Sequence, residues 1–243
     1  MRHEGGVPAT VRDGSENQRE INLLKHHVAE MSELALGMVT DGTRALLQGD
    51  AELGRSVTAR DAALDRYDLN VETEAIHLVA TLQPEGRDLR AIESTIKIAG
   101  CIDRIGRLGF DLARNVGATE SPTDSGTREL LRQMGEIGRS MVAQALHAFM
   151  TDDAVEAKAV FARDDEVDAL YHRTRDQLIA LLRRGGPATD RLVYEVLASR
   201  HLERVADNAC KIAEKAVYAI TGERRSEYLP VYPRRAGSAS PRP

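Results

Sequence analysis

The residues best placed to do chemistry are pairs of carboxylates spaced four residues apart in stretches expected to be helical. Three such pairs are singled out by their positions: Asp61 with Asp65, Asp164 with Asp168, and Glu203 with Asp207. Residues four apart lie on one face of a helix, about 5–6 Å apart between Cβ atoms, so the two charges of each pair repel each other. The question for each pair is therefore what balances its negative charge.

The first two pairs lie at the edge of an apolar stripe. Asp61 follows Val57 by four residues and precedes Leu64 by three. Asp164 likewise follows Val160 by four residues and precedes Val167 by three. A carboxylate at the edge of a core needs a positive charge nearby, from arginine, lysine or a metal ion. A solvated acidic face is the alternative interpretation for any single pair.

Glu203 and Asp207 flank the apolar arc of the last expected helix. If that helix lies beside the one that carries Asp164 and Asp168, the four carboxylates can converge on one surface. Ligand sets made only of oxygen suit Mg, Mn, Ca or oxidised Fe better than Zn. We therefore expect a divalent or trivalent metal ion with oxygen ligands at this surface.

The Asp-x-x-x-Asp stretches belong to a long internal repeat. Residues 57–65 and 160–168 match at an offset of 103, and past a shorter turn the offset becomes 100, which aligns residues 103–105 with residues 203–205. A chance match would not keep its register across two helices and then resume after one small deletion. Long helices joined by short turns predict an all-α fold of two tandem antiparallel three-helix bundles, related by a pseudo-two-fold axis.

Apolar residues at i, i+3 and i+4 predict six helices that alternate with turn signals. The expected helices span residues 16–48, 50–82, 84–116, 127–150, 152–184 and 188–220. Asp50 and either Asp152 or Asp153 are expected to cap the second and fifth helices, and Gly222 to end the sixth. The predicted domains are therefore residues 16–117 and 127–222, with flexible tails at 1–15 and 223–243.

Composition restricts the class of protein. The chain has 243 residues, 42% of them hydrophobic and only 4% aromatic, which favours a globular core of aliphatic side chains packed helix against helix. A formal charge of −5 with interleaved signs argues against nucleic acid as a partner. No stretch has the roughly 18 apolar residues that span a bilayer, and the polar N-terminus has no signal-peptide pattern. Cys101 and Cys210 are expected to be small buried residues in a reducing cytoplasm.

Four short motifs occur together along the chain. The third helix of each half carries a related stretch, Asp103-Arg104-Ile105-Gly106-Arg107 in the first and Glu203-Arg204-Val205-Ala206-Asp207 in the second. The third helix of the first half opens with residues 83–90, and Leu170-Tyr171 follows the second Asp-x-x-x-Asp pair. Over about residues 20–222 this combination resembles the PhoU family of phosphate-transport accessory and regulatory proteins.

The resemblance implies a function as well as a fold. It implies a cytoplasmic regulator that couples phosphate uptake to phosphate-responsive gene expression and is not an enzyme. Its implied partners are the ATPase subunit of the phosphate ABC transporter and a sensor histidine kinase, so the chain would meet the membrane only through them. Metal at the acidic faces would be structural or would mediate docking. A homodimer is also expected, because long amphipathic bundles leave apolar seams to cover.

One position departs from the family pattern. Where the family has a second carboxylate in the first-half motif, this chain has Arg107, which can form a salt bridge with Asp103 four residues earlier. Asp111, one turn further on, is the candidate replacement ligand. Asp103 therefore stays a candidate metal ligand with Asp61 and Asp65, but we expect the second half to bind metal better than the first.

Two other functions stay open at this point. One is a metal-dependent oxidase or hydrolase, although Glu74 and His77 form only a single Glu-x-x-His pair, and di-iron bundles need two. The chain also has no Walker loop, no dinucleotide-binding glycine motif after a strand and no nucleophile elbow. The other is a helical adaptor unrelated to phosphate, in which the acidic pairs are merely solvated.

Overall fold

The computed structural model describes residues 14–114, 116, 125–185 and 189–228, and its regular elements there are all helical. The first half contains four helices: α1 (Gly14–Gln48), α2 (Ala51–Thr58), α3 (Asp61–Leu82) and α4 (Gly86–Arg114). The second half contains α5 (Ser125–Met150), α6 (Ala154–Ala159), the 3₁₀ turn η1 (Val160–Arg163), α7 (Asp164–Arg184), α8 (Thr189–Thr221) and α9 (Arg225–Tyr228). The prediction of an all-α chain is confirmed.

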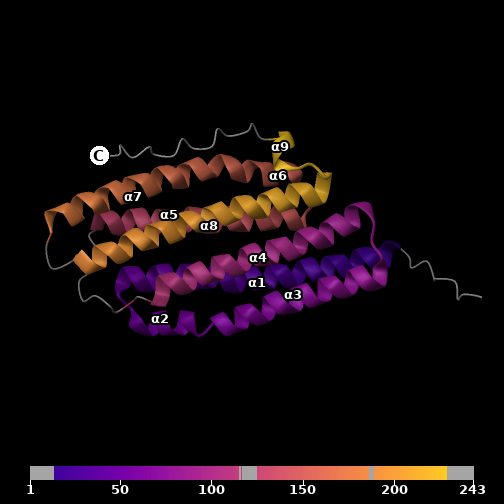
Figure 1. Cartoon of the computed structure of the whole chain (residues 1–243), viewed down its shortest axis with the longest axis horizontal. Coiled ribbons are helices and arrows are strands. Elements are labelled where there is room, and N and C mark those ends of the chain that lie inside the picture. The colour runs from indigo at the N-terminus through magenta and orange to yellow at the C-terminus, as the bar shows by residue number, and fades with distance from the viewer. Residues whose placement is uncertain (1–13, 115, 117–124, 186–188, 229–243) are drawn as a thin grey trace, which may run out of the picture.

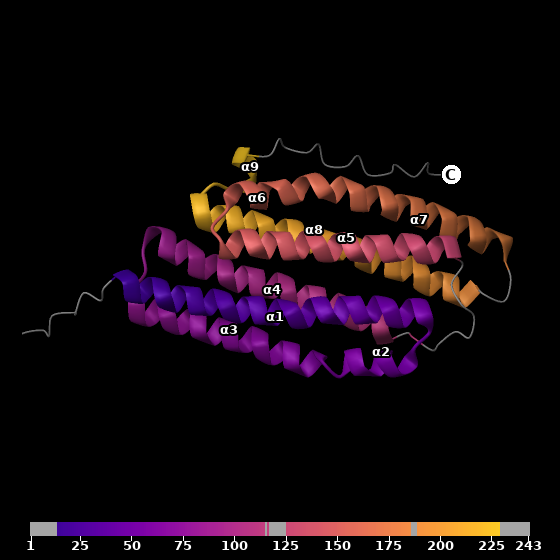
Figure 2. The ribbon, with the colours of Figure 1, turned by 180° about the vertical axis from the view of Figure 1, so that it is seen from behind.

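The helices form two antiparallel three-helix units stacked side by side (Figure 1). In the first unit α1 and α4 pack together with the α2–α3 segment, and in the second α5 and α8 pack with the α6–α7 segment. The units meet along two seams, α4 against α8 and α1 against α5. Figure 2 shows α1 and α5 on the near side, so the α4–α8 seam lies behind them.

The second and fifth predicted helices are each interrupted. The helical pattern pauses at Ala59 and Arg60, and again at the 3₁₀ turn 160–163, so α3 and α7 begin at Asp61 and Asp164. At the first break the amide of Arg60 bonds the carbonyl of Val57, three residues back, which tightens the turn. The prediction of continuous helices there was wrong. The spacing of apolar residues continues across both breaks, so the sequence pattern gives no sign of them.

The predicted caps are confirmed where the structure describes them. The Asp50 carboxylate accepts from the amide of Leu53 at 3.0 Å, and Asp153 accepts from two amides at the start of α6, each at 2.9 Å. Gly222 ends α8 with φ of +81°, a conformation that costs glycine little. Of the predicted tails, residues 1–13 and 229–243 lie outside the described residues, whereas α9 is helical.

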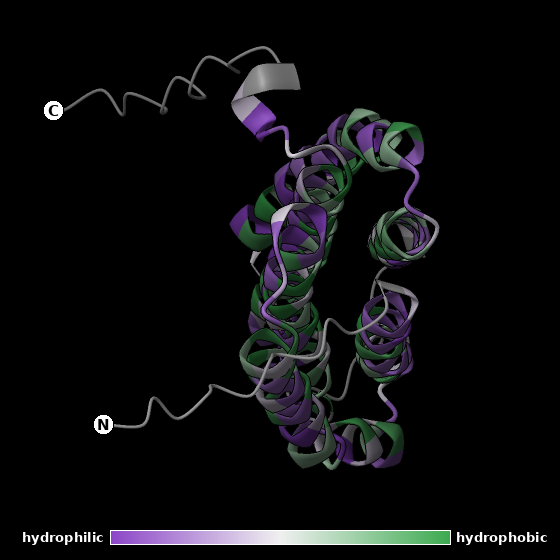
Figure 3. Cartoon of the chain, turned by 90° about the vertical axis from the view of Figure 1, so that its right-hand side faces the viewer, coloured by the Kyte–Doolittle hydropathy of each residue, from purple (hydrophilic) through white to green (hydrophobic). Residues whose placement is uncertain are grey.

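The core consists of aliphatic side chains that line the facing sides of the long helices. Its largest fully buried members include Leu24, Met31, Met38, Ile98, Ile102, Ile105, Leu112, Leu131 and Phe149. Burying such side chains contributes about 1.5–3 kcal/mol each. Leu, Ile, Val, Ala and Met supply most of this core, as the scarcity of aromatic residues predicts. Figure 3 looks along the helices and shows the units as a curved stack.

Two buried cations join the units at opposite ends. Near one end, Lys25 Nζ of α1 donates to the Phe149 carbonyl at 3.1 Å and to Asp152 Oδ1 at 2.9 Å, both in the second unit. At the other end, Arg191 of α8 donates to the carbonyl of Leu46 in α1 at 3.3 Å. Because buried charges are costly unless paired, these contacts restrict how the units lie against each other. None of the described helices is long and apolar enough to cross a membrane.

Candidate functional site

Arg107 is the centre of the acidic cluster in the first unit. Its Nε lies 3.0 Å from Asp103 Oδ2, one turn earlier on α4. Its Nη2 lies 2.6 Å from Asp65 Oδ1, and its Nη1 lies 3.7 Å from Asp61 Oδ1, both on α3. The predicted Asp103–Arg107 salt bridge is therefore confirmed, and the same guanidinium also contacts the Asp-x-x-x-Asp pair of the neighbouring helix.

The electrostatics of this cluster favour a cation at its centre. The hydrogen bond and the charge of Asp103 raise the pKa of Arg107 above its ordinary value. Asp68, one turn beyond Asp65, has a raised pKa because it is partly buried and lies near the charges of Asp103 and Glu72. One guanidinium thus faces more carboxylates than it can neutralise, and the cluster keeps a net negative charge.

In the second unit the charges of Asp164, Arg225 and Asp207 all act on Cys210, and the position equivalent to Arg107 is itself Asp207. Both carboxylates lie close to Cys210, which is buried on α8. Burial, the charge and hydrogen bond of Asp164, and the charge of Asp207 raise the pKa of the Cys210 thiol far above its ordinary value. The expected adjacency of the fifth and sixth helices is therefore present, because α7 packs against α8.

Glu203 lies one turn before Asp207 and is buried, with 4% of its surface exposed. Arg200 Nη1 pairs with Glu203 Oε1 at 2.6 Å, and the Arg200 guanidinium lies 5.9 Å from the ring centroid of Tyr171 on α7. Asp168 is half-buried on α7. Among the described residues no three His, Cys, Asp or Glu side chains are already placed to surround a metal ion.

The two helix breaks account for the position of the Asp-x-x-x-Asp pairs. Because Asp61 and Asp164 open α3 and α7, their carboxylates lie at the positive end of each helix dipole. The arginine before each aspartate reaches back to the first helix of its unit: Arg60 pairs with Asp41 at 2.8 Å, and Arg163 donates to Gln144 at 3.2 Å. The repeat therefore includes a structural anchor that the sequence interpretation missed.

The remaining candidate residues lie elsewhere. Asp111 pairs with Arg114 at 3.4 Å, and its charge acts on the pKa of His201 on α8. The contacts of Asp111 are therefore directed away from Arg107. Glu74 lies 2.6 Å from His27 on α1, a tertiary pair, whereas His77 is exposed. The Glu-x-x-His spacing therefore does not describe a shared site in this unit.

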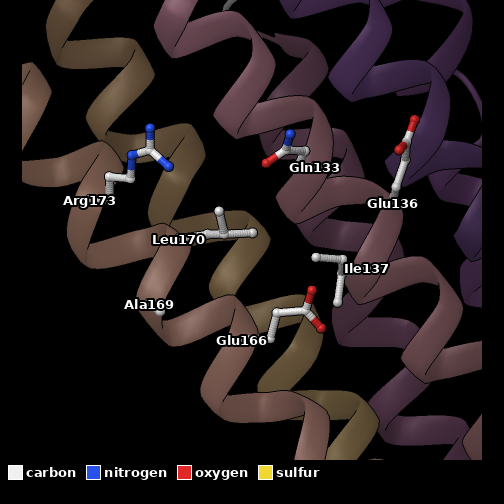
Figure 4. A pocket seen from close by; sticks show the side chains of 7 residues that line it. All are labelled: Gln133, Glu136, Ile137, Glu166, Ala169, Leu170 and Arg173. Atoms are coloured by element: carbon white, nitrogen blue, oxygen red, sulfur yellow. The ribbon is translucent and has the colours of Figure 1, made fainter.

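A shallow pocket of about 400 Å³ lies between α5 and α7, and none of the four carboxylates of the second acidic face lines it (Figure 4). Ile137 and Leu170 form its apolar floor, and Glu166 and Arg173 stand on the α7 side with opposite charges. Nothing in this lining is a nucleophile beside a base. The pocket can accommodate an amphipathic side chain of a partner, and it supplies no catalytic group of that kind.

The chain is similar over most of its length to proteins of one family. The model of the PhoU domain matches residues 28–116 and again residues 131–216. A phosphate-specific transport system accessory protein PhoU homolog from Caulobacter vibrioides is 30% identical over 217 residues, covering 87% of this chain and 92% of that protein. The homolog from Rhizobium meliloti is also 30% identical, over 84% of this chain and 86% of its own length.

Solved structures agree with this match. The crystal structure of PhoU from Pseudomonas aeruginosa superposes with a TM-score of 0.79 at 30% identity, over 85% of this chain and 99% of that one. The phosphate transport system regulatory protein PhoU from Streptococcus pneumoniae gives a TM-score of 0.78 at 25% identity, over 86% and 98%. These names describe accessory and regulatory proteins, in agreement with the prediction that the chain is not an enzyme. Two matches to one domain model, over the two units that the internal repeat defines, show that this chain belongs to the PhoU family.

Proposed function

We propose that this chain acts in phosphate transport as a cytoplasmic regulator of phosphate uptake and of phosphate-responsive gene expression. The observation that supports this most directly is the match to accessory proteins of the phosphate-specific transport system over more than four-fifths of the chain. The chain would act by binding two partners, the ATPase subunit of the phosphate ABC transporter and a sensor histidine kinase. A role in binding fits a site made of charged helix faces.

The second acidic face is the proposed metal site. Asp164, Asp168, Glu203 and Asp207 would supply the oxygen ligands, which suit Fe, Mn, Mg or Ca. The proposal is supported by the charges of Asp164 and Asp207, which both act on the Cys210 thiol between α7 and α8. When bound, the metal would supply positive charge that offsets the repulsion between these carboxylates.

The first acidic face has a built-in cation instead. Arg107 contacts Asp61, Asp65 and Asp103 with its three nitrogens, which is the position a metal ion would share with them. A guanidinium and a divalent cation in one cluster repel each other. We therefore expect the metal content of the protein to depend on the second unit far more than on the first.

Metal content tests the proposed asymmetry. The full chain is incubated with Mn²⁺, dialysed, and measured by mass spectrometry of the metal, alongside a Glu203→Ala/Asp207→Ala variant and an Asp103→Ala variant. We expect the double variant to lose most of the bound metal and the Asp103→Ala variant to lose little. Equal losses would contradict the asymmetry, and a metal-free parent protein would contradict the site itself.

Gene deletion tests the phosphate role. Expression from a phosphate-starvation promoter is measured in the source organism, in a deletion strain, and in deletion strains that carry the parent gene or the Glu203→Ala/Asp207→Ala gene. We expect deletion to release expression at high phosphate and the parent gene to restore repression. Unchanged expression after deletion would favour the adaptor unrelated to phosphate.

The proposed partners and the proposed homodimer need separate measurements. Co-purification of the full chain with the transporter ATPase subunit, and with the sensor kinase, from the same organism tests each contact. Light scattering coupled to size-exclusion chromatography gives the mass in solution, and we expect twice the chain mass of 26.7 kDa. A mass of one chain at micromolar concentration would contradict the homodimer, and it would leave the proposed partners and metal site unaffected.

A further inference from the structure

A groove of about 800 Å³ runs between α1 and α5 along one seam of the two units. Its floor is apolar and small, made of the partly or fully buried residues Leu36, Gly37, Val39, Leu47 and Gly135. On α1 the groove faces away from α4, because Gly42, on the opposite side of the helix, meets Gly109.

The rim of this groove carries more positive than negative charge, in a chain whose net charge is −5. Its charged residues are the cations Arg44, Arg128, Arg132 and Arg139, and the anions Glu33, Asp41 and Glu136. Asp41 is already paired with Arg44 and Arg60, and Glu136 with Arg132. In the described part of the chain, Arg128 and Arg139 have no ion-pair partner, and both are exposed.

The dimensions of the groove match a helix. The α1 wall extends from Glu33 to Gln48, about 22 Å at 1.5 Å per residue, which is the length of a helix of roughly 15 residues. Arg128 and Arg139 are eleven residues apart, three turns along the same face of α5, so they mark two positions about 16 Å apart. An apolar floor between charged walls is the usual recognition surface for an amphipathic helix.

We propose that the α1–α5 groove binds an acidic amphipathic helix of a protein partner. The leucine-rich face of that helix would cover the apolar floor, and its carboxylates would pair with Arg128 and Arg139. A nucleic acid fits less well, because Glu33, Asp41 and Glu136 on the rim would repel a continuous phosphate backbone. The inference goes beyond the proposed phosphate role and does not require it, since it rests on the shape and charge of this groove alone.

A designed helix serves as the probe. It is a fluorescein-labelled 16-residue peptide with leucines on one face and glutamates flanking them, and its control has lysine in place of every glutamate. Fluorescence anisotropy measures binding of each peptide to the full chain. We expect the glutamate peptide to bind and the lysine peptide to bind at least tenfold more weakly, with affinity for the glutamate peptide falling as NaCl rises.

Substitutions in the groove locate the binding surface. We expect Arg128→Ala/Arg139→Ala to weaken binding of the glutamate peptide about five- to tenfold, which is the size expected for the loss of two exposed ion pairs. Thr40→Trp, which fills the groove without changing charge, should weaken it as well. The matched control Arg104→Ala/Arg204→Ala removes two exposed arginines from α4 and α8 and should leave binding unchanged. Circular dichroism confirms that each variant folds.

Several outcomes would overturn the inference. Equal binding of both peptides, equal losses in the groove and control variants, or no binding of the glutamate peptide would each do so. Displacement of the peptide by an equimolar single-stranded oligonucleotide would identify the groove as a nucleic-acid site instead. None of these results depends on phosphate signalling, so failure here and failure of the proposed phosphate role are distinguishable.

Discussion

The two units of this chain have the same helices but balance charge differently at the same place. In the first unit Arg107 contacts three carboxylates from two helices, whereas its counterpart in the second is Asp207, which adds a further negative charge. In the first cluster the protein's own arginine side chain therefore supplies the positive charge. The second needs protons, nearby arginines or an external ion, and this difference separates a purely structural cluster from a candidate binding site.

The units also differ in the residues that lie where their first and last long helices cross. In the first, Gly42 and Gly109 lie where α1 crosses α4, and a β-carbon at Gly109 would lie 2.5 Å from the backbone of Met38. The corresponding residues of the second unit are Ala145 and Ala209, both fully buried. The same sequence repeat thus supports a glycine-mediated crossing in one unit and an alanine-mediated crossing in the other.

The largest expected effect comes from exchanging these residues. Gly109→Ala should destabilise the protein by about 2–4 kcal/mol, because the new methyl group meets backbone that cannot rotate away. The reciprocal Ala209→Gly should cost only about 1–2 kcal/mol, from helix propensity and one lost methyl group. Urea unfolding followed by circular dichroism measures both. A Gly109→Ala variant more stable than the parent, as in an open helix, would contradict the close crossing.

The next effect tests the charge difference itself. Arg107→Asp removes the internal cation and copies the charge of the second unit. Without added metal we expect the free energy of unfolding to fall by about 1 kcal/mol. The effect is small because the Arg107 side chain is half exposed to solvent. With Mn²⁺ we expect more bound metal per chain than in the parent, measured by mass spectrometry of the metal. An Arg107→Lys variant is the control, and it should gain no metal.

A smaller effect concerns the thiol of the second unit. Burial and the neighbouring Asp164 raise the pKa of Cys210, so little thiolate forms at pH 8 and reaction with Ellman's reagent should be slow in the folded chain. Asp164→Asn removes one charge and should speed labelling of Cys210 several-fold. Cys101, whose pKa is raised chiefly by burial, is the internal control and should label at its parent rate. A general increase at both thiols would indicate local unfolding instead.

The smallest expected effect is a pH dependence in the first unit. Asp68 has a raised pKa in the fold, because of partial burial and the charges of Asp103 and Glu72, so its ionisation opposes folding. Below the unfolded pKa of about 3.8, Asp68 is protonated in both states and does not oppose folding. As pH rises through the higher pKa of the folded state, Asp68 must ionise in the fold, and stability is lost. Asp68→Asn should therefore stabilise the protein slightly at pH 7 and not at pH 3. The same gain at both pH values would exclude a charge effect.

The helices and caps were largely predictable because they depend on local chemistry. Asp50 was identifiable as a cap and Gly222 as a helix end, since each acts on backbone within a few residues. For the fifth helix the prediction left Asp152 and Asp153 open, and the structure selects Asp153. The breaks before Asp61 and Asp164 were not predictable, because a turn of two to four residues with near-helical backbone barely shifts the apolar phase. The contact between Arg107 and Asp103 was predictable at four residues' separation, but the contact with Asp65 was not.

By itself the sequence determined the all-helical class, the two-fold repeat, the caps and the asymmetry between Arg107 and Asp207. These are properties of spacing and residue type along one chain, so periodicity reveals them. Only the tertiary structure decided which helices are neighbours. It therefore decided that Arg107 reaches Asp61 and Asp65, that Asp164 of α7 lies against Cys210 of α8, and that a groove opens between α1 and α5. Those contacts join residues tens to more than a hundred positions apart, and their partners are set by helix packing, which no local pattern records.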